Sequence, residues 1–150
     1  MRWAETDLLN LLHDEGEKYL LSAGFATNLP GYGPAPSSLY LGIDNRVTVE
    51  RAHTLVQVVE AEPDGYKRVP LSTAKDFFPL DDPIFTLAME VQFTAEADLG
   101  TVRNAFLCTA SSGSAGRLLV SVPLRKARPM FEQDTLTFEC QLSLRQTLIS

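Results

Sequence analysis

Apolar and polar residues alternate along much of the second half of the chain. In residues 84–94 and again in residues 135–145, large apolar side chains fall on nearly every second position, and most positions between them carry Thr, Ser, Gln or Glu. A period of two sends successive side chains to opposite faces of a β-strand, so one face is buried and the other is wetter. Alternation of this length is typical of antiparallel sheets covered on one side. We therefore expect a β-sandwich or a β-barrel.

Shorter apolar runs predict the remaining strands. They span Leu39–Ile43, Thr54–Ala61, Tyr66–Leu71, Val102–Thr109 and Arg117–Leu124. Residues 62–65, Glu-Pro-Asp-Gly, have the composition of a tight turn, which would join the second and third of these runs into a hairpin. Residues 72–83 and the Ser/Gly-rich residues 110–116 carry many turn formers and are expected to be irregular. The sequence thus predicts a mainly β fold: an antiparallel jelly-roll-like β-sandwich with an N-terminal α-helix and an extended Pro/Gly-rich arm.

The first segment of the chain has helical periodicity. From Ala4 to Ala23 the leucines recur at spacings that form one broad apolar stripe, with acidic and amide side chains between them. Glu5 and Asp7 would favour the N-terminus of this helix through its dipole, and Gly24 would end it. Such a helix either covers one end of the sheet core or docks on a neighbouring subunit.

A long irregular segment follows the expected helix. Residues 26–38 contain three prolines and two glycines, which exclude regular structure. A connection of this length is unusual in a compact domain, so we expect a linker or an arm that becomes ordered against a partner. The predicted organisation is an N-terminal helix and arm over residues 1–38, then a β-sandwich domain with a short C-terminal tail over residues 39–150.

The composition is that of an ordinary globular protein of 150 residues. No apolar run approaches the roughly 20 residues that cross a bilayer, so no membrane association is expected. The N-terminus lacks the basic and then apolar pattern of a signal peptide, which predicts a cytoplasmic site of synthesis. The formal net charge of −6 argues against nucleic acid as a partner.

Charge is unevenly distributed along the chain. Residues 99–131 contain five basic residues and no acid, whereas residues 50–98 contain ten acids and four bases. Two regions of opposite sign suit self-association or docking on an acidic protein surface. The alternative is that both are solvated loops with uneven charge.

Candidate catalytic and metal-binding residues are sparse. His13 falls in the expected helix and His53 at the start of a valine-rich run, and neither has a Ser, Cys or acid at a recognised nucleophile or metal spacing. Cys108 and Cys140 take apolar positions of expected strands, where each would be a small buried hydrophobe; a disulfide between them is possible if the strands are neighbours. Turn chemistry explains Asp81-Asp82, although a cation site is the other interpretation. We expect no enzymatic activity, no metal and no cofactor.

A series of short landmarks runs from the first expected strand to the last. In chain order they are Leu39-Tyr40-Leu41-Gly42-Ile43, Gly65-Tyr66-Lys67-Arg68-Val69, Leu99-Gly100-Thr101-Val102, Ala105-Phe106-Leu107, the Ser/Gly-rich turn 111–116, Leu118-Leu119, and an acidic turn into an alternating strand at 132–138. This order resembles a family of small tailed-bacteriophage virion proteins. The chain departs from the family pattern by lacking the common Trp after the Gly-Tyr-x-Arg strand and before Val102. Members of the family are similar to capsid decoration (cement) proteins or to minor tail and fibre-associated proteins, and the resemblance supplies no catalytic residues.

The resemblance implies a non-enzymatic virion structural protein. The favoured expectation is a capsid decoration protein on the outer surface of the head, where a homo-oligomer, with a trimer favoured, would bridge subunits of the major capsid protein and stabilise the shell. The alternative is a minor tail or tail-fibre-associated module that takes part in host-surface recognition. The residues expected at the partner interface are Trp3, Leu8, Leu12, Tyr19, Leu29, Tyr32 and, from a basic loop at 125–128, Arg125, Lys126 and Arg128.

Overall fold

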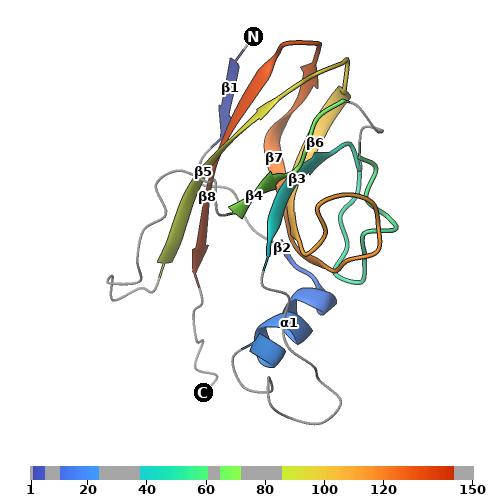
Figure 1. The fold of residues 1–150 in the computed structure, drawn as a ribbon, viewed down its shortest axis with the longest axis vertical. Coiled ribbons are helices and arrows are strands. Elements are labelled where there is room, and N and C mark those ends of the chain that lie inside the picture. The colour runs from blue at the N-terminus through green and yellow to red at the C-terminus, as the bar shows by residue number, and fades with distance from the viewer. Residues whose placement is uncertain (1, 6–10, 24–37, 61–64, 72–85, 144–150) are drawn as a thin grey trace.

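The computed structural model describes residues 2–5, 11–23, 38–60, 65–71 and 86–143. Within these ranges the chain forms eight strands and one helix (Figure 1). The elements are β1 (Arg2–Glu5), β2 (Leu11–Leu12), α1 (Asp14–Leu21), β3 (Tyr40–Asp44), β4 (Val69–Pro70), β5 (Thr86–Thr94), β6 (Gly100–Cys108), β7 (Leu118–Met130) and β8 (Thr135–Ser143). No helix in these ranges is long and apolar enough to span a membrane.

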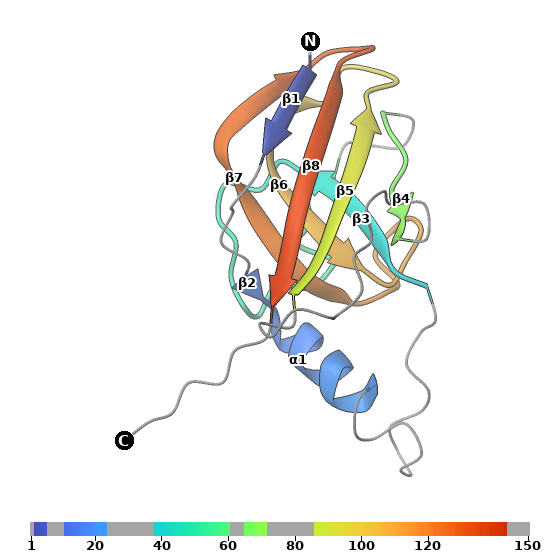
Figure 2. The ribbon, with the colours of Figure 1, turned by 90° about the vertical axis from the view of Figure 1, so that its left-hand side faces the viewer.

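Two sheets form the body of the molecule. β1, β8 and β5 make a three-stranded sheet in that order, and β2, β7, β6, β3 and β4 make a five-stranded sheet. Every neighbouring pair is antiparallel except β1 and β8, which run parallel. Figure 2 shows the three-stranded sheet in front of the five-stranded one, with α1 below both. The expected mainly β, largely antiparallel architecture with one helix is confirmed.

The main core lies between the two sheets. Val91 and Phe93 of β5 and Leu136 and Phe138 of β8 are buried in one cluster with apolar residues of β3, β6 and β7. On β5 the intervening Gln92 is exposed, as the alternation predicted. Burying a side chain of this size stabilises the fold by about 1.5–3 kcal/mol, so the residues that face inward on the two sheets hold them together.

Two of the connections between the sheets lie entirely within the described residues, and they lie side by side. One joins β5 to β6 and the other joins β7 to β8. Ala95 donates its N–H to Asp134 O at 2.8 Å, and Gln133 donates to Ala95 O at 2.8 Å. Leu99 then donates to Met130 O at 2.9 Å. These backbone bonds close the end of the sandwich where both crossings occur.

The outer face of the five-stranded sheet is covered as well. Residues 45–60 form an irregular loop, and Leu55 from this loop packs with Phe106 and Leu118 in a second buried cluster. Gly42 of β3 leaves room for the aromatic ring, because a Cβ at this position would lie 2.4 Å from Phe106 Cζ. Both faces of the central strands are therefore buried.

The N-terminal prediction needs correction. A single helix was expected from Ala4 to Ala23, but β1 and β2 are strands and α1 covers only the last part of that range. Glu5 lies in β1, not at a helix N-terminus, while Asp7 and Gly24 lie outside the described residues. Pairing of β1 with β8 and of β2 with β7 overrides the leucine periodicity, which is a weak preference. The expected boundary at residue 38 thus does not separate these elements from the sheets.

A strand was expected over the valine-rich residues 54–61, but the described part of this run, residues 54–60, is not a strand. Gln57 donates its N–H to Thr54 O at 3.1 Å, and its Oε1 accepts the N–H and the hydroxyl of Thr54 at 2.7 and 3.0 Å. These local bonds close a turn where a strand was expected. The predicted hairpin with Tyr66–Leu71 is wrong for the same reason: its only strand, β4, pairs with β3.

Strand β7 also differs from the prediction, because it continues through the expected basic loop. Its register on β6 jumps: Asn104 faces Pro123, whereas Val102 faces Arg128. Residues 124–127 therefore bulge out of the ladder opposite a single residue of β6. We call residues 124–127 the basic bulge; its charged members, both exposed, are Arg125 and Lys126.

Strands β3, β5, β6 and β8 lie close to their expected positions. The irregular loop at residues 110–116 is confirmed. Most of the expected turn at 62–65, the segment 72–83 and nearly all of the Pro/Gly arm lie outside the described residues.

Candidate functional site

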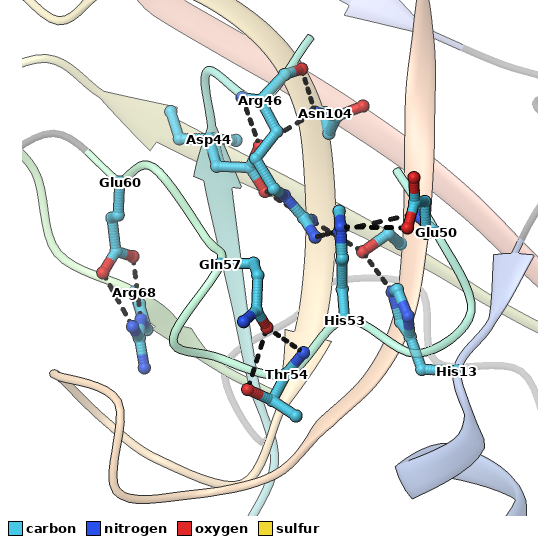
Figure 3. A network of polar contacts seen from close by, with 12 residues as sticks. His13, Asp44, Arg46, Glu50, His53, Thr54, Gln57, Glu60, Arg68 and Asn104 are labelled. Carbon is cyan, nitrogen blue, oxygen red and sulfur yellow. Dashed lines mark hydrogen bonds and ion pairs between the residues drawn. The ribbon is translucent and has the colours of Figure 1, made fainter. Parts of the chain in front are cut away.

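A buried ion pair lies on the outer face of the five-stranded sheet. Asp44 ends β3 and Arg46 follows it, and both side chains are almost fully buried (Figure 3). Arg46 donates to Asp44 Oδ2 from Nη2 at 2.7 Å and from Nε at 3.1 Å. Asp44 Oδ1 accepts the Arg46 backbone N–H at 2.9 Å and Nδ2–H of Asn104 in β6 at 2.8 Å. Complete pairing of this kind is what makes two buried charges tolerable.

A histidine from the N-terminal segment joins this ion pair. Ser121 Oγ of β7 accepts a hydrogen bond from Arg46 Nη2 at 2.8 Å and lies 2.7 Å from His13 Nε2. His13 Nδ1 lies 3.3 Å from the carbonyl oxygen of Arg51. Because that oxygen can only accept, Nδ1 carries the proton and Nε2 accepts the Ser121 hydroxyl proton. We call this group the Arg46 network; its members are His13, Asp44, Arg46, Asn104 and Ser121.

The imidazole of His13 is held in its neutral form. Burial lowers the pKa of His13 below its usual 6.5, and the positive charge of Arg46 acts in the same direction, against the hydrogen bond to the Arg51 carbonyl. His53 approaches Arg46 from the loop, with 3.4 Å between His53 Nδ1 and Arg46 Nη1 (Figure 3). Its Nε2 lies 3.8 Å from Glu50 Oε2.

A second network fastens the other end of the 45–60 loop. Arg68 donates to both oxygens of Glu60, from Nε to Oε2 at 2.8 Å and from Nη2 to Oε1 at 2.7 Å. The Tyr66 hydroxyl donates to Glu60 Oε2 and accepts the N–H of Ile43 at 2.8 Å. Burial and the neighbouring Glu60 carboxylate raise the pKa of Tyr66 well above its usual value. We call Glu60, Tyr66 and Arg68 the Arg68 network.

The Arg68 guanidinium also holds the loop at residues 110–116. Its Nη1 donates to Ala110 O and its Nη2 to Gly113 O, both at 2.8 Å. Its central carbon lies 5.2 Å from the centre of the Phe106 ring, within range of a cation–π interaction. Burial alone would lower the pKa of Arg68, but the hydrogen bonds to Glu60 raise it, so the group stays charged. One side chain thus joins two loops and the sheet.

A hollow of about 540 Å³ opens beside the Arg68 network. Its apolar wall comes from Leu55, Val56 and Val58 of the loop, and its polar wall includes Glu60, Lys67 and the serine-rich residues 111–114. The carboxylate oxygens of Glu60 and the nitrogens of Arg68 are already bonded to protein groups. The groups that remain for a ligand are therefore the Lys67 ammonium and the serine hydroxyls.

The contact between Ser121 and His13 is of the type that activates a nucleophile. Both residues are 0% exposed, and Arg46 covers the same hydroxyl, so this contact is closed to a substrate in this conformation. The described residues contain no group of three or more His, Cys, Asp or Glu that could hold a metal ion. Cys108 is a free, buried thiol whose pKa is raised by burial, which agrees with the small hydrophobic role expected for it.

The expected interface residues are placed unequally. Arg125 and Lys126 lie together and exposed in the basic bulge, while Arg128 is half-buried near the end of β7. Leu12 is half-buried in β2, and Tyr19 of α1 packs against the main core. Among the expected interface residues whose side chains the structure describes, Arg125 and Lys126 are the exposed ones. For Trp3, in β1, the structure describes only the backbone. Leu8, Leu29 and Tyr32 lie outside the described residues.

Sequence reasoning missed the two buried arginines that organise these networks. One signal for the first was available: Asp44 and Arg46 directly follow an apolar strand and are two residues apart, so an extended chain places both on one face. Their partners Ser121 and His13 are distant in sequence and carry no such signal.

The comparisons with known proteins add no relative. Neither known family profiles, nor curated proteins, nor solved structures give a match to this chain.

Proposed function

We propose that this chain is a non-enzymatic structural protein of a tailed-bacteriophage virion, and specifically a capsid decoration protein. In this role it binds the outer surface of the head and bridges subunits of the major capsid protein. Each bridge buries surface that is exposed in the undecorated shell, so binding stabilises the shell by mass action. The protein needs no metal or cofactor for this task.

The observation that carries the proposal is the position of the family landmarks in the fold. Gly42, Tyr66, Arg68 and Phe106 come from three separate landmarks, yet they form one continuous set of contacts. Gly42 lies against the Phe106 ring, Arg68 lies over that ring, and Tyr66 bonds to the backbone beside Gly42, at Ile43. Landmarks that meet in space belong to one structural core, as a shared fold would require, and this is the support for the resemblance to virion proteins.

The surface supplies a second line of support. The basic bulge places Arg125 and Lys126 side by side in the sequence, both exposed, on a chain whose net charge is −6. A local basic patch on an acidic protein favours a particular orientation on an acidic partner surface. The polar groups of the two buried networks, in contrast, bind protein segments to the sheet.

The proposal includes the finer description of the fold. Jelly rolls are double sheets in which the chain passes repeatedly from one sheet to the other. The β5–β6 and β7–β8 connections are passages of this kind. Residues 26–38 would act as an arm that becomes ordered on the capsid. A trimer at a local threefold axis is the proposed assembly, because it would place three basic bulges around one junction of capsid subunits.

Copy number and location in the particle test the proposal. The particle is the virion of the phage that encodes the chain, imaged by cryo-electron microscopy, with the copy number measured by quantitative mass spectrometry against the major capsid protein. Hundreds of copies on the outside of the head are expected. A handful of copies at the tail would replace decoration with a tail or fibre role.

Binding by the isolated protein provides the matching test in solution. We expect sedimentation with expanded, undecorated heads and no retention on host cells. Retention on cells without head binding would overturn the decoration role.

A further inference from the structure

The segment that runs from β2 into α1 is held against the five-stranded sheet by direct backbone contacts. His13 donates its N–H to Leu119 O at 2.9 Å, and Asp14 donates to Arg51 O at 3.0 Å. Glu15 Oε2 accepts the N–H of Leu118 at 2.8 Å. The first turn of the helix comes so close to β7 that a Cβ on Gly16 would lie 2.2 Å from Leu119 O. We call residues 11–21 the docked segment.

The side chain at the centre of this contact is the imidazole of His13. It is fully buried between β7 and the 45–60 loop, with Ser121 on one nitrogen and the Arg51 carbonyl on the other. The Ser121 hydroxyl has one proton, and Arg46 already donates to its oxygen. Because Nδ1 of the neutral ring carries its proton towards the Arg51 carbonyl, Nε2 is an acceptor and takes the hydroxyl proton.

A second proton would give the imidazole a positive charge, and the described groups around it do not balance this charge. Arg46 and His53 face the imidazole from the loop and both act to lower its pKa, and the N-terminus of α1 adds a partial positive charge. Asp44 is saturated by Arg46 and Asn104.

The remaining acids face other partners. Glu50 lies beside His53, Glu15 accepts from β7, and the exposed Asp14 and Glu17 pair with Arg51. Within the described residues, no carboxylate forms a hydrogen bond or an ion pair with His13.

We propose that His13 is an acid-sensitive latch: protonation of its imidazole releases the docked segment from β7 and from the 45–60 loop while the two-sheet core stays folded. Release moves the imidazolium into water, away from the Arg46 guanidinium, and exposes the buried faces of Leu12 and Tyr19. The latch belongs to the fold itself and does not depend on the identity of the partner.

The direction of the pH effect follows from proton linkage. Because the docked state lowers the pKa of His13 below 6.5, the released state binds the proton more tightly. Docking is therefore complete above about pH 6.5 and weakens as the pH falls from there towards the docked-state value. One proton per opening event changes the opening equilibrium constant about tenfold per pH unit in that range.

Native-state hydrogen exchange between about pH 7.5 and pH 5 tests the latch. The reporters are the amides of His13 and Asp14, and the references are the amides of β6, with intrinsic exchange rates corrected for pH. We expect protection of the reporters to fall about tenfold per pH unit below 6.5 while β6 keeps its protection. Reporters that show no pH dependence, or that lose protection only together with β6, would overturn the proposal.

A matched pair of variants separates the two histidines. His13→Gln keeps a neutral donor and acceptor near the ring nitrogens but cannot titrate, so the pH dependence of the reporters should disappear. His53→Gln removes the only other histidine of the chain and should leave the pH dependence of the reporters intact. An unchanged pH dependence in His13→Gln would rule out the latch.

One further measurement does not depend on any variant folding. The NMR titration of the His13 ring in the unmodified protein should give a pKa below 6.5, over the same pH range as the loss of protection. A ring that titrates at or above 6.5 contradicts the proposal.

Discussion

Asp44 and Arg46 have almost no contact with water, and each charged atom faces a protein group instead. Such a pair matters for the free energy of unfolding mainly because both partners are present. Removing one partner leaves the other charge buried without an opposite charge. Arg68 and Glu60 repeat the pattern at the far end of the 45–60 loop. In both networks the residue that holds most contacts is an arginine, whose planar fork can serve several acceptors at once.

Replacing the buried carboxylate tests this argument. Asp44→Asn keeps the size of the side chain but leaves the Arg46 guanidinium unpaired, so we expect the free energy of unfolding to fall by about 3–5 kcal/mol in urea denaturation. The matched control is Asp14→Asn, because Asp14 lies 3.7 Å from Arg51 with both side chains more than half exposed. That change should cost less than about 1 kcal/mol. Equal changes in the free energy of unfolding for the two substitutions would show that burial of the Asp44–Arg46 pair does not make its loss more costly.

The 45–60 loop shows, at the scale of an element, how an irregular segment becomes ordered. It contributes one buried leucine, Leu55, while Val47 and Val56 are exposed, so apolar burial alone does not hold it. Its order comes from Arg46 at one end and from the contact of Glu60 with Arg68 at the other. Loops normally lack such support and are correspondingly mobile.

Replacing the planar guanidinium of Arg68 by an ammonium keeps the positive charge, but we expect it to free both loops that Arg68 holds. Arg68→Lys places one ammonium where Glu60, Ala110 and Gly113 each take a hydrogen bond, and it cannot serve all of them. We expect a loss of about 2 kcal/mol in the free energy of unfolding and faster hydrogen exchange in residues 45–60 and 110–116. The neighbouring, exposed Lys67→Arg should change neither quantity. Exchange that speeds up evenly over all strands would contradict a local role.

The elements that the sequence predicted well are those with a local pattern. Alternation located β5 and β8, because buried and exposed positions repeat every second residue there regardless of the rest of the fold. The valine-rich residues 54–61 have strand composition, but Thr54 and Gln57 bond to each other and form a turn. β-propensity measures fit to a pleated, half-buried surface, and none of the described strands pairs with residues 54–60.

The candidate site was beyond prediction for a different reason. His13 and Ser121 are separated by 108 positions, and their contact depends on β2 and β7 being neighbours. Leucine periodicity instead pointed to one continuous helix through residue 13. Arg125, Lys126 and Arg128 were expected together in a basic loop, whereas the structure places the exposed Arg125 and Lys126 in a bulge within β7 and the half-buried Arg128 directly after it.

On the scale of the whole molecule, the basic bulge lies on a protein whose total charge is negative. The net charge opposes approach to an acidic partner, so attraction must come from a local patch in the correct orientation. Such an interaction is screened over about 10 Å at 0.1 M salt and is therefore sensitive to ionic strength.

Charge reversal locates the docking face. Arg125→Glu with Lys126→Glu should abolish sedimentation with heads and the salt dependence of binding, because the local attraction becomes repulsion. The control is Lys67→Glu with Arg117→Glu, which makes the same change in net charge at exposed positions outside the bulge. Binding is measured by co-sedimentation at about 50 mM and about 500 mM salt. Equal loss in both double variants would mean that net charge, and not the bulge, determines docking.

The parallel pairing of β1 with β8 has a mechanical consequence. Arg2 stands opposite Thr135 and Glu5 opposite Phe138, so the two strands point the same way. A force that pulls residue 2 and residue 143 apart acts along both strands in opposite directions. It loads the hydrogen bonds between them in shear, all together, whereas pulling on one end of an antiparallel hairpin breaks them one after another. The first and last strands of the described fold thus form a clamp that resists stretching along the long axis of the sandwich.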